Sequence, residues 1–146
     1  MIYPILLYNK NNKKKLRLKS TSISKYTNLL NLINNMFDTM YYYNGIGLSA
    51  PQIGLNIKLF IISIYNKKKV FINPKILKIS KKKIIYKEGC LSLPNIYKNV
   101  LRSKKIIIQY YNKYWVLKKK KIKNLFSIIY QHEYDHLFGK LILDYK

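Results

Sequence analysis

Residues 131–136 read Gln131-His-Glu-Tyr-Asp-His136, and they contain both histidines of this 146-residue chain. An α-helix turns about 100° per residue, so His136 lies about 40° round from His132 and one turn along, where both imidazoles can bind one ion. Glu133 lies about 100° from His132, close enough to reach a water on that ion without being a ligand. These residues can also be read as polar side chains on a helix surface. The pairing of the only two histidines favours a metal site.

The sequence around these histidines predicts a helix from Asn124, its expected N-cap, to about Phe138, with Gly139 ending it. Three apolar residues of this helix share the histidine face. They stand three, four and seven positions before His132: Ile129, Ile128 and Leu125. We expect them to form a dry wall beside the ion, which strengthens electrostatic interactions there.

A catalytic metal site needs three protein ligands and one open position, so a third ligand must come from elsewhere in the chain. Downstream of His136 the only candidate is Asp144, and the extended zincin pattern H-E-x-x-H-x-x-G-x-x-H has Ile142 at its last position. The remaining soft donor is Cys90, whose thiolate suits a transition metal. A lone buried cysteine is more often inert core filler. Against that reading, the glycine and proline flanking Cys90 indicate a shaped strand end.

The rest of the chain alternates apolar patterns with turn signals. Apolar residues at helical spacing predict a helix over residues 25–43, ended by Asn44-Gly45. A tight hairpin turn is expected at Asn112-Lys113. β-Branched and aromatic runs predict strands at residues 58–65, 70–72, 76–79, 84–87, 105–111 and 114–118, and a short final strand at 141–144. Lysine runs are expected in solvated turns or at strand ends: residues 13–15, 67–69, 81–83 and 118–121.

This order of elements predicts an α+β fold. Strands precede a helix with no regular βαβ alternation, which favours antiparallel β-strands packed around a C-terminal metal-binding helix carrying HExxH, with an N-terminal helix. A length of 146 residues fits one compact domain with a sizeable core. We therefore expect residues 1–146 to form a single catalytic domain.

The net charge has two explanations. The chain has 29 Lys and Arg against 5 Asp and Glu, a formal charge of +24, which suggests a polyanion binder such as a nucleic-acid-, ribosome- or membrane-surface-binding protein. However, Arg17 and Arg102 are the only arginines, so 29 − 2 = 27 of the basic residues are lysine. Phosphate and base recognition favours arginine. Because Lys, Asn, Ile and Tyr all have codons rich in A and T, drift of codon usage explains most of the charge.

The cysteine count and the lengths of the apolar runs indicate the cellular compartment. The single cysteine, Cys90, excludes an internal disulfide and suits a reducing compartment. No apolar run approaches the ~20 residues of a membrane span, and the apolar start at residues 1–8 lacks the flanks of a signal peptide. We expect a cytoplasmic protein with no membrane partner.

Glycine, cysteine and histidine are rare in this chain, and they occur in or beside three stretches: residues 45–52, 88–92 and 131–136. Together these stretches resemble the peptide deformylase family. The family motifs are G-x-G-[LA]-[AS]-A-x-Q, E-G-C-L-S and Q-H-E-x-D-H. They are matched, in the same order, by Gly45-Ile-Gly-Leu-Ser-Ala-Pro-Gln52, Glu88-Gly-Cys-Leu-Ser92 and Gln131-His-Glu-Tyr-Asp-His136. The resemblance extends from about Leu16-Arg17 to Tyr145 and includes Asn73-Pro74. It implies a metal-dependent hydrolase that removes the formyl group from the N-terminal formyl-methionine of nascent polypeptides and releases formate.

The resemblance also implies roles for individual residues. Three residues correspond to the metal ligands: Cys90, His132 and His136. Glu133 corresponds to the general acid and base, while the Gln52 side-chain amide and the Leu91 backbone N–H correspond to the donors that hold the formyl oxygen. The family ion is typically Fe²⁺, with Zn²⁺, Ni²⁺ or Co²⁺ also accepted. A thiolate with two imidazoles is compatible with any of these ions.

Further residues are expected around this centre. Substrate binding, including the methionine side chain, is expected from Ile46, Gly47, Leu125, Ile128 and Ile129. Asp135 can buttress the helix or a neighbouring side chain. Glu88 and Arg102 are opposite charges that can pair across the site entrance and hold the Cys90 segment, although an ordinary surface pairing explains them equally well.

Two other functions stay open on sequence alone. One is a basic RNA- or ribosome-binding protein with a relict metal site, and the other is a zincin endopeptidase, which the missing third ligand weakens. Family members commonly continue into a C-terminal extension, associated in bacteria with ribosome docking, and we expect residues 1–146 to lack it. Formyl-Met nascent peptides are the expected partners, with a weak attraction to the ribosome or its RNA through the lysine-rich surface.

Overall fold

Helix α3 (Asn124–His136) lies at the centre of the fold and contacts both β-sheets. The structure is a computed structural model and describes all residues 1–146. The other elements, in chain order, are α1 (Lys13–Leu16), α2 (Leu30–Tyr42), β1 (Gly47–Ser49), the 3-10 helix η1 (Ala50–Ile53), β2 (Leu59–Ile64), β3 (Lys67–Ile79), β4 (Lys83–Cys90), β5 (Leu93–Ser103), β6 (Lys105–Tyr111), β7 (Leu117–Lys123) and the 3-10 helix η2 (Ile142–Asp144).

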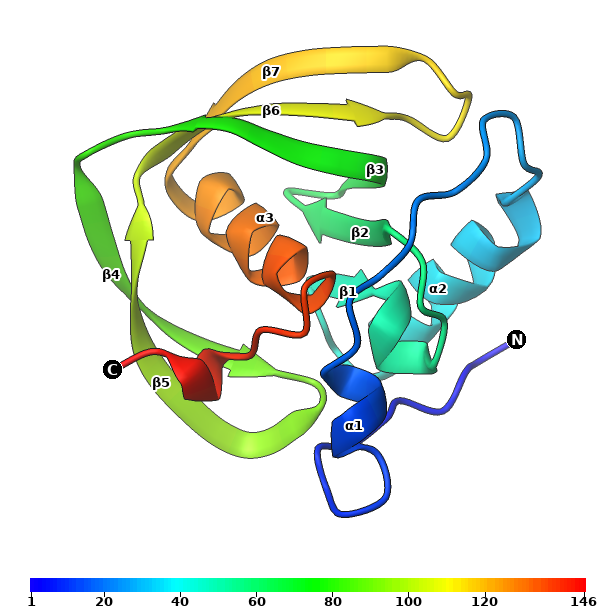
Figure 1. Cartoon of the computed structure of the whole chain (residues 1–146), viewed down its shortest axis with the longest axis horizontal. Helices are drawn as coiled ribbons and strands as arrows, with labels where there is room; N and C mark the ends of the chain where they lie inside the picture. Colours follow the sequence, from blue (N-terminus) through cyan, green and yellow to red (C-terminus); the bar gives the residue numbers. More distant parts are fainter.

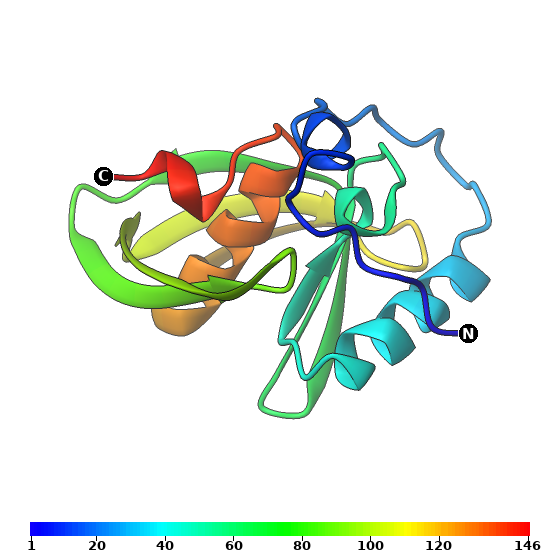
Figure 2. The ribbon, with the colours of Figure 1, turned by 90° about the horizontal axis from the view of Figure 1, so that it is seen from below.

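The larger sheet has five strands in the order β1-β2-β3-β6-β7, and the smaller sheet is the β4–β5 hairpin. Every neighbouring pair in both sheets is antiparallel. Figure 1 shows α3 between the larger sheet and the β4–β5 hairpin, and Figure 2 shows α2 and α3 on opposite sides of strands β2 and β3. The predicted α+β fold, with antiparallel strands around the HExxH helix, is confirmed.

Strand β2 separates two hydrophobic cores. Side chains of a strand alternate between its two faces, and in β2 both faces are buried. Leu59 and Ile61 face the cluster that α2 contributes to, and Phe60 and Ile62 face the cluster around α3. This two-sided burial explains why β2 begins with four consecutive apolar residues, 59–62.

Strand β3 corrects the prediction of separate strands at 70–72 and 76–79. It is one long strand, and its ladder with β6 shifts register between Ile72 and Lys75. Asn73 has φ 48° and Pro74 has no N–H to donate, so the chain bends at this point without leaving the sheet. The interruption of the apolar pattern reflects this irregularity.

The prediction of a tight turn at Asn112-Lys113 followed by a strand at 114–118 is wrong. The turn is longer: the Asn112 side chain accepts hydrogen bonds from the backbone N–H groups of Tyr114 and Val116, and Trp115 has φ 59°. Strand β7 therefore begins at Leu117 and includes the lysine run 118–121, which we expected in a turn or at a strand end. Because β7 is an edge strand, its lysines protect that edge against pairing with another chain.

Two strands were not predicted. β1 has three residues, too few for a periodic pattern, and β5 mixes apolar with polar residues and has mostly exposed positions, so it shows no regular alternation. The lysine run 13–15, also expected in a turn, belongs to the short helix α1, whose Leu16 is buried.

The two main helices are shorter than the sequence predicted. Helix α2 begins at Leu30 rather than residue 25, because Tyr26 has φ 69°, which a helix excludes; the expected stop at Asn44-Gly45 is confirmed. Helix α3 ends at His136, before Gly139 at φ 71°. Asn124 is not the expected cap, because it has φ 57° and its N–H donates to the Lys104 carbonyl at the turn from β7 into the helix.

The predicted final strand at 141–144 is instead the 3-10 helix η2. Asp144 Oδ2 accepts a hydrogen bond from the Leu141 backbone N–H at 2.9 Å, and this bond closes the turn. Arg17 holds the same carboxylate from α1. None of the helices has the length and apolar character that crossing a membrane requires.

Candidate metal centre

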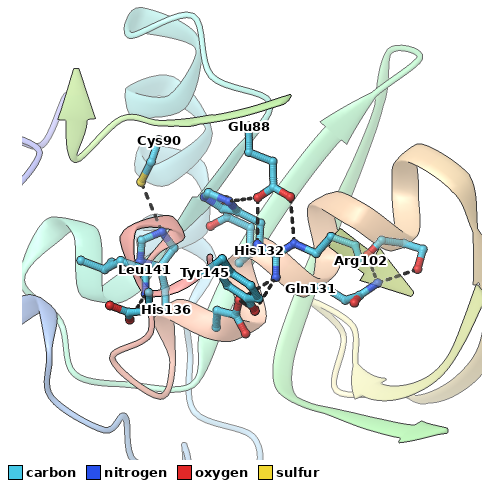
Figure 3. A network of polar contacts seen from close by, with 12 residues as sticks. Glu88, Cys90, Arg102, Gln131, His132, His136, Leu141 and Tyr145 are labelled. Carbon is cyan, nitrogen blue, oxygen red and sulfur yellow. Dashed lines mark hydrogen bonds and ion pairs between the residues drawn. The ribbon is translucent and has the colours of Figure 1, made fainter. Parts of the chain in front are cut away.

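Helix α3 and the end of strand β4 bring three soft donor atoms together. Cys90 Sγ lies 3.4 Å from His136 Nε2, and the donor atoms of Cys90, His132 and His136 all lie within 4.8 Å of one another. Donor atoms around one tetrahedral transition-metal ion are about 3.3–3.6 Å apart. The cluster therefore has the donor types and the approximate spacing for one such ion. Figure 3 shows these side chains.

The orientation of His132 is fixed by its second ring nitrogen. His132 Nδ1 lies 2.8 Å from Glu88 Oε1, an arrangement in which the imidazole donates its Nδ1–H to the carboxylate and leaves Nε2 free to bind an ion. His136 has no such partner, and its buried Nδ1 makes no hydrogen bond within the protein. Burial, then the nearby His132, lower the pKa of His136 well below its usual value, which favours the neutral form that binds metals.

The Glu88–Arg102 pair is buried rather than on the surface. Arg102 Nε and Nη2 each donate to Glu88 at 2.8 Å, and the side chains are 3% and 5% exposed. Burial by itself would raise the pKa of Glu88, but the hydrogen bonds from Arg102 and His132 outweigh it and hold the pKa below its usual value. Glu88 is therefore a fixed negative charge behind His132.

Asp135, which is 18% exposed, joins this buried pair as a third charged side chain. Its Oδ2 accepts a hydrogen bond from Arg102 Nη1 at 2.7 Å, so Arg102 bridges two carboxylates. Sequence reasoning gave Asp135 only a general buttressing role, since no local pattern reveals a partner 33 residues away.

Glu133 lies next to the donor cluster and is 4% exposed. Its Oε1 is 3.8 Å from His132 Nε2, and its Oε2 has no hydrogen-bond partner in the protein. Burial raises the pKa of Glu133 to about 7, although the nearby His132 opposes the shift. A Cβ added to Gly47 would lie 2.8 Å from Glu133 Oε1, so β1 approaches this carboxylate closely only because residue 47 is glycine.

Gln52 approaches the cluster from the 3-10 helix η1. Its Oε1 accepts hydrogen bonds from the backbone N–H and the hydroxyl of Ser49, both at 3.1 Å, which fixes the direction of the amide. Its Nε2 points to Ser92 Oγ at 3.2 Å and to Cys90 Sγ at 3.5 Å. The sequence placed Ser92 in the motif around Cys90 but indicated no role for its hydroxyl. Gln52 thus places an amide donor beside the thiol.

Four of these residues line a cavity of about 840 Å³: Gln52, Cys90, His132 and Glu133. Of the residues expected around the substrate, the cavity is lined by Ile46, Gly47, Leu91, Ile128 and Ile129. Leu125 is the exception, because it lies about 10 Å along the helix from His132 and packs in the core cluster around α3. Sequence reasoning also missed Tyr43, Tyr86, Lys87 and Tyr97 at this cavity, since they belong to no motif.

Asp144 was the one downstream candidate for a peptidase-type third ligand. Its carboxylate pairs with another residue instead. Both of its carboxylate oxygens accept hydrogen bonds from Arg17, at 2.5 and 3.0 Å. Cys90 is the residue that completes the cluster with the two histidines.

The chain is similar to known proteins over its whole length. Residues 2–146 match the family model described as Polypeptide deformylase. A peptide deformylase from Karelsulcia muelleri is 53% identical, and the match covers 99% of this chain and 78% of that relative. The crystal structure of peptide deformylase from Thermotoga maritima superposes with a TM-score of 0.94 at 35% identity, over 99% of this chain and 97% of that one. A peptide deformylase structure from Legionella pneumophila has a TM-score of 0.92 at 33% identity, over 100% and 86%.

Proposed function

The chain belongs to the polypeptide deformylase family, whose members remove the formyl group from the N-terminal formyl-methionine of nascent polypeptides, and we propose that residues 1–146 form one domain that performs this reaction at the Cys90–His132–His136 cluster. The observation that supports the proposal is the clustering of these three donors at a cavity that a buried carboxylate and an amide donor also line, together with two of the three, Cys90 and His132. Apart from His136, the residues given roles in the reaction below line that cavity.

The proposed metal ligands are Cys90, His132 and His136. A bound divalent ion would supply Lewis acidity, which lowers the pKa of water to about 7 and so would provide a nucleophile at neutral pH. We propose Fe²⁺ as the resident ion because it is the ion typical of the family that the chain resembles. Zn²⁺, Ni²⁺ and Co²⁺ are the proposed substitutes, since a thiolate with two imidazoles suits all four ions.

Glu133 is the proposed general base and acid. Its Oε2 has no partner within the protein and is free to take a proton from the attacking water. Attack on the formyl carbon breaks the carbonyl π bond and leaves negative charge on the formyl oxygen. Glu133 then gives the proton to the leaving amine, the carbon–nitrogen bond breaks, and the products are formate and a free methionine N-terminus.

Gln52 and Leu91 are the proposed donors to the negatively charged formyl oxygen. The Gln52 amide is already oriented by Ser49, so its N–H is in place before substrate binds. Leu91 lines the cavity one residue after Cys90 and offers its backbone N–H. The methionine side chain, which is flexible and apolar, fits the wall made by Ile46, Ile128 and Ile129 beside Gly47.

Formate release from formyl-Met-Ala-Ser tests this proposal. We expect turnover by the wild-type chain, loss of turnover on adding a chelator, and recovery on adding back Fe²⁺ under anaerobic conditions. Cys90→Ala should not recover, because its site has lost one of three ligands. An RNA-binding protein with a relict site would release no formate, and an endopeptidase would cleave internal peptide bonds instead.

We also propose a weak attraction to the ribosome or its RNA. Lysines gather on one part of the larger sheet, where burial and three neighbouring lysines lower the pKa of Lys69: Lys120, Lys67 and Lys118. Such a cluster binds phosphate backbones without sequence preference, by releasing counterions. A cytoplasmic location is consistent with this partner and stays a prediction.

The attraction predicts steeply salt-dependent binding to ribosomal RNA. Replacing Lys118 and Lys120 by glutamine should weaken binding and reduce the slope of log K against log salt by about 0.7–0.9 for each phosphate that is no longer neutralised. Filter binding at several salt concentrations measures the slope. The matched control replaces Lys13 and Lys14 of α1. Equal reductions in both double variants would show that only the total charge matters and would contradict a site on the sheet.

A further inference from the structure

The segment after α3 returns to the charge cluster behind His132. Tyr145, which follows η2, donates a hydrogen bond from its hydroxyl to Asp135 Oδ2 at 2.6 Å. The same hydroxyl accepts one from Arg102 Nη1 at 2.9 Å. Figure 3 shows Tyr145 against Arg102, with His132 on the far side of Glu88. The hydroxyl therefore closes a triangle with Asp135 and Arg102.

From this triangle a continuous set of hydrogen bonds leads to the proposed metal ligand. Arg102 uses Nη1 for Tyr145 and Asp135, and uses Nε and Nη2 for Glu88. Glu88 in turn holds Nδ1 of His132. The planar guanidinium presents its donors in a fixed fork. A rotation of the fork at the Tyr145 end would therefore also move Glu88.

The hydrogen bonds of Arg102 matter because this charged side chain is buried. Arg102 is 3% exposed, and burial of a charge is costly unless every donor and acceptor has a partner. Without the tyrosine hydroxyl, Asp135 would lose one donor and Arg102 would lose one acceptor. Burial, then Asp135, raise the pKa of Tyr145 above its usual value, so the hydroxyl keeps the proton that it donates.

The Tyr145 ring is held independently of its hydroxyl. The ring lies against the Arg102 guanidinium, whose central carbon Cζ is 4.7 Å from the ring centroid. Lys140 Nζ lies 4.2 Å from the same centroid. Arg17 fixes the segment before it, by hydrogen bonds to Asp144 and to the Gly139 carbonyl at 3.0 Å. The segment after α3, here called the tail (residues 137–146), thus reaches Arg102 in a defined position.

We propose that Tyr145 is a positioning residue of the metal centre: its hydroxyl orients Asp135 and Arg102, which hold Glu88 and thereby His132. The inference rests on the proposed metal site. It assigns to the tail a function in keeping the metal bound and correctly oriented, beyond packing against the domain.

Tyr145→Phe tests the proposal because it removes the hydroxyl and keeps the ring on Arg102. The measurement is the rate at which EDTA removes Co²⁺ from the loaded full-length chain, followed by the visible absorption of the cobalt–thiolate centre. Loss of a direct partner of a metal-bound histidine typically costs 10–100-fold in affinity or activity. Tyr145 is further removed, so we expect Co²⁺ to leave about 3–10-fold faster, with a lower kcat and an unchanged KM.

Two further measurements separate positioning from general stability. Tyr65→Phe is the matched control, since Tyr65 is 79% exposed and should release Co²⁺ at the wild-type rate. A double-mutant cycle with Asp135→Asn asks whether the hydroxyl acts through Asp135, in which case the two effects are not additive. Circular dichroism at increasing temperature gives Tm for each variant.

The outcomes are distinct. Faster Co²⁺ loss in Tyr145→Phe, coupled to Asp135→Asn, supports the proposal. An unchanged rate overturns it, with or without a lower Tm, and so do additive effects in the cycle. If the wild-type chain binds no Co²⁺, the metal site itself is wrong, and this result is separate from any property of Tyr145.

Discussion

Glu133→Gln is expected to lower kcat by about 10²- to 10⁴-fold while the metal content of the protein is unchanged. The amide has nearly the same shape as the carboxylate and is not one of the three donors in the cluster. It cannot accept the proton of the attacking water or return one to the leaving amine. Formate release from formyl-Met-Ala-Ser gives kcat, and elemental analysis of the purified variant gives the metal content.

The matched control for this variant is Asp38→Asn. It is the same change of acid to amide, made on α2 at a side chain that is 59% exposed and pairs only with the N-terminal amine. We expect wild-type kcat for this control. A Glu133→Gln enzyme that deformylates at the wild-type rate with full metal content would show that another group transfers the proton.

Gln52→Glu is expected to lower kcat about 10²- to 10³-fold, the usual effect of losing one donor to a developing oxyanion. Glutamate keeps an oxygen in place to accept the two hydrogen bonds from Ser49. The amide N–H is replaced by a second oxygen, which repels the negative charge on the formyl oxygen. The substrate is bound by other groups, so we expect the loss in kcat rather than in KM.

Ser92→Ala controls for disturbance of the surroundings of Gln52. It removes the hydroxyl that Gln52 Nε2 contacts at 3.2 Å and leaves the amide itself present. A loss of less than about tenfold is expected, since one neutral hydrogen bond contributes about 1 kcal/mol. The oxyanion role of Gln52 would be refuted if Ser92→Ala lost as much activity as Gln52→Glu.

The sequence predicted the parts of the centre that depend on local geometry. His132, Glu133 and His136 share a helix, so their spacing alone determines their relative directions. The chemistry of Cys90 alone was compatible with either a metal ligand or an inert core residue. The family resemblance identified it as a ligand. The contacts of Arg102 with Glu88 and Asp135 span 14 and 33 residues, and no local pattern shows that these groups are buried together.

The fold was predicted less evenly, for physical reasons that differ between elements. Helix α3 and strand β6 have strong periodic patterns, and both were predicted close to their observed bounds. Strand β7 was misplaced because its position depends on the hydrogen bonds of the Asn112 side chain, and the composition of residues 118–121 indicated a loop. Leu125 was placed at the cavity because it shares a helix face with His132. It lies about 10 Å from His132 along the helix axis, too far to line the same cavity.

The contact between Arg17 and Asp144 has a consequence for the order of folding. It joins residues 127 positions apart, and closing so long a loop costs chain entropy that local contacts do not. Structures that depend on contacts of high sequence separation form slowly. Helix α3, which carries both histidines, can form early. The hydrogen bond between Tyr145 and Arg102 can form only after residue 145 has been synthesised. The proposed metal ligand His132 therefore gains its full set of supporting contacts only after these long-range contacts have formed.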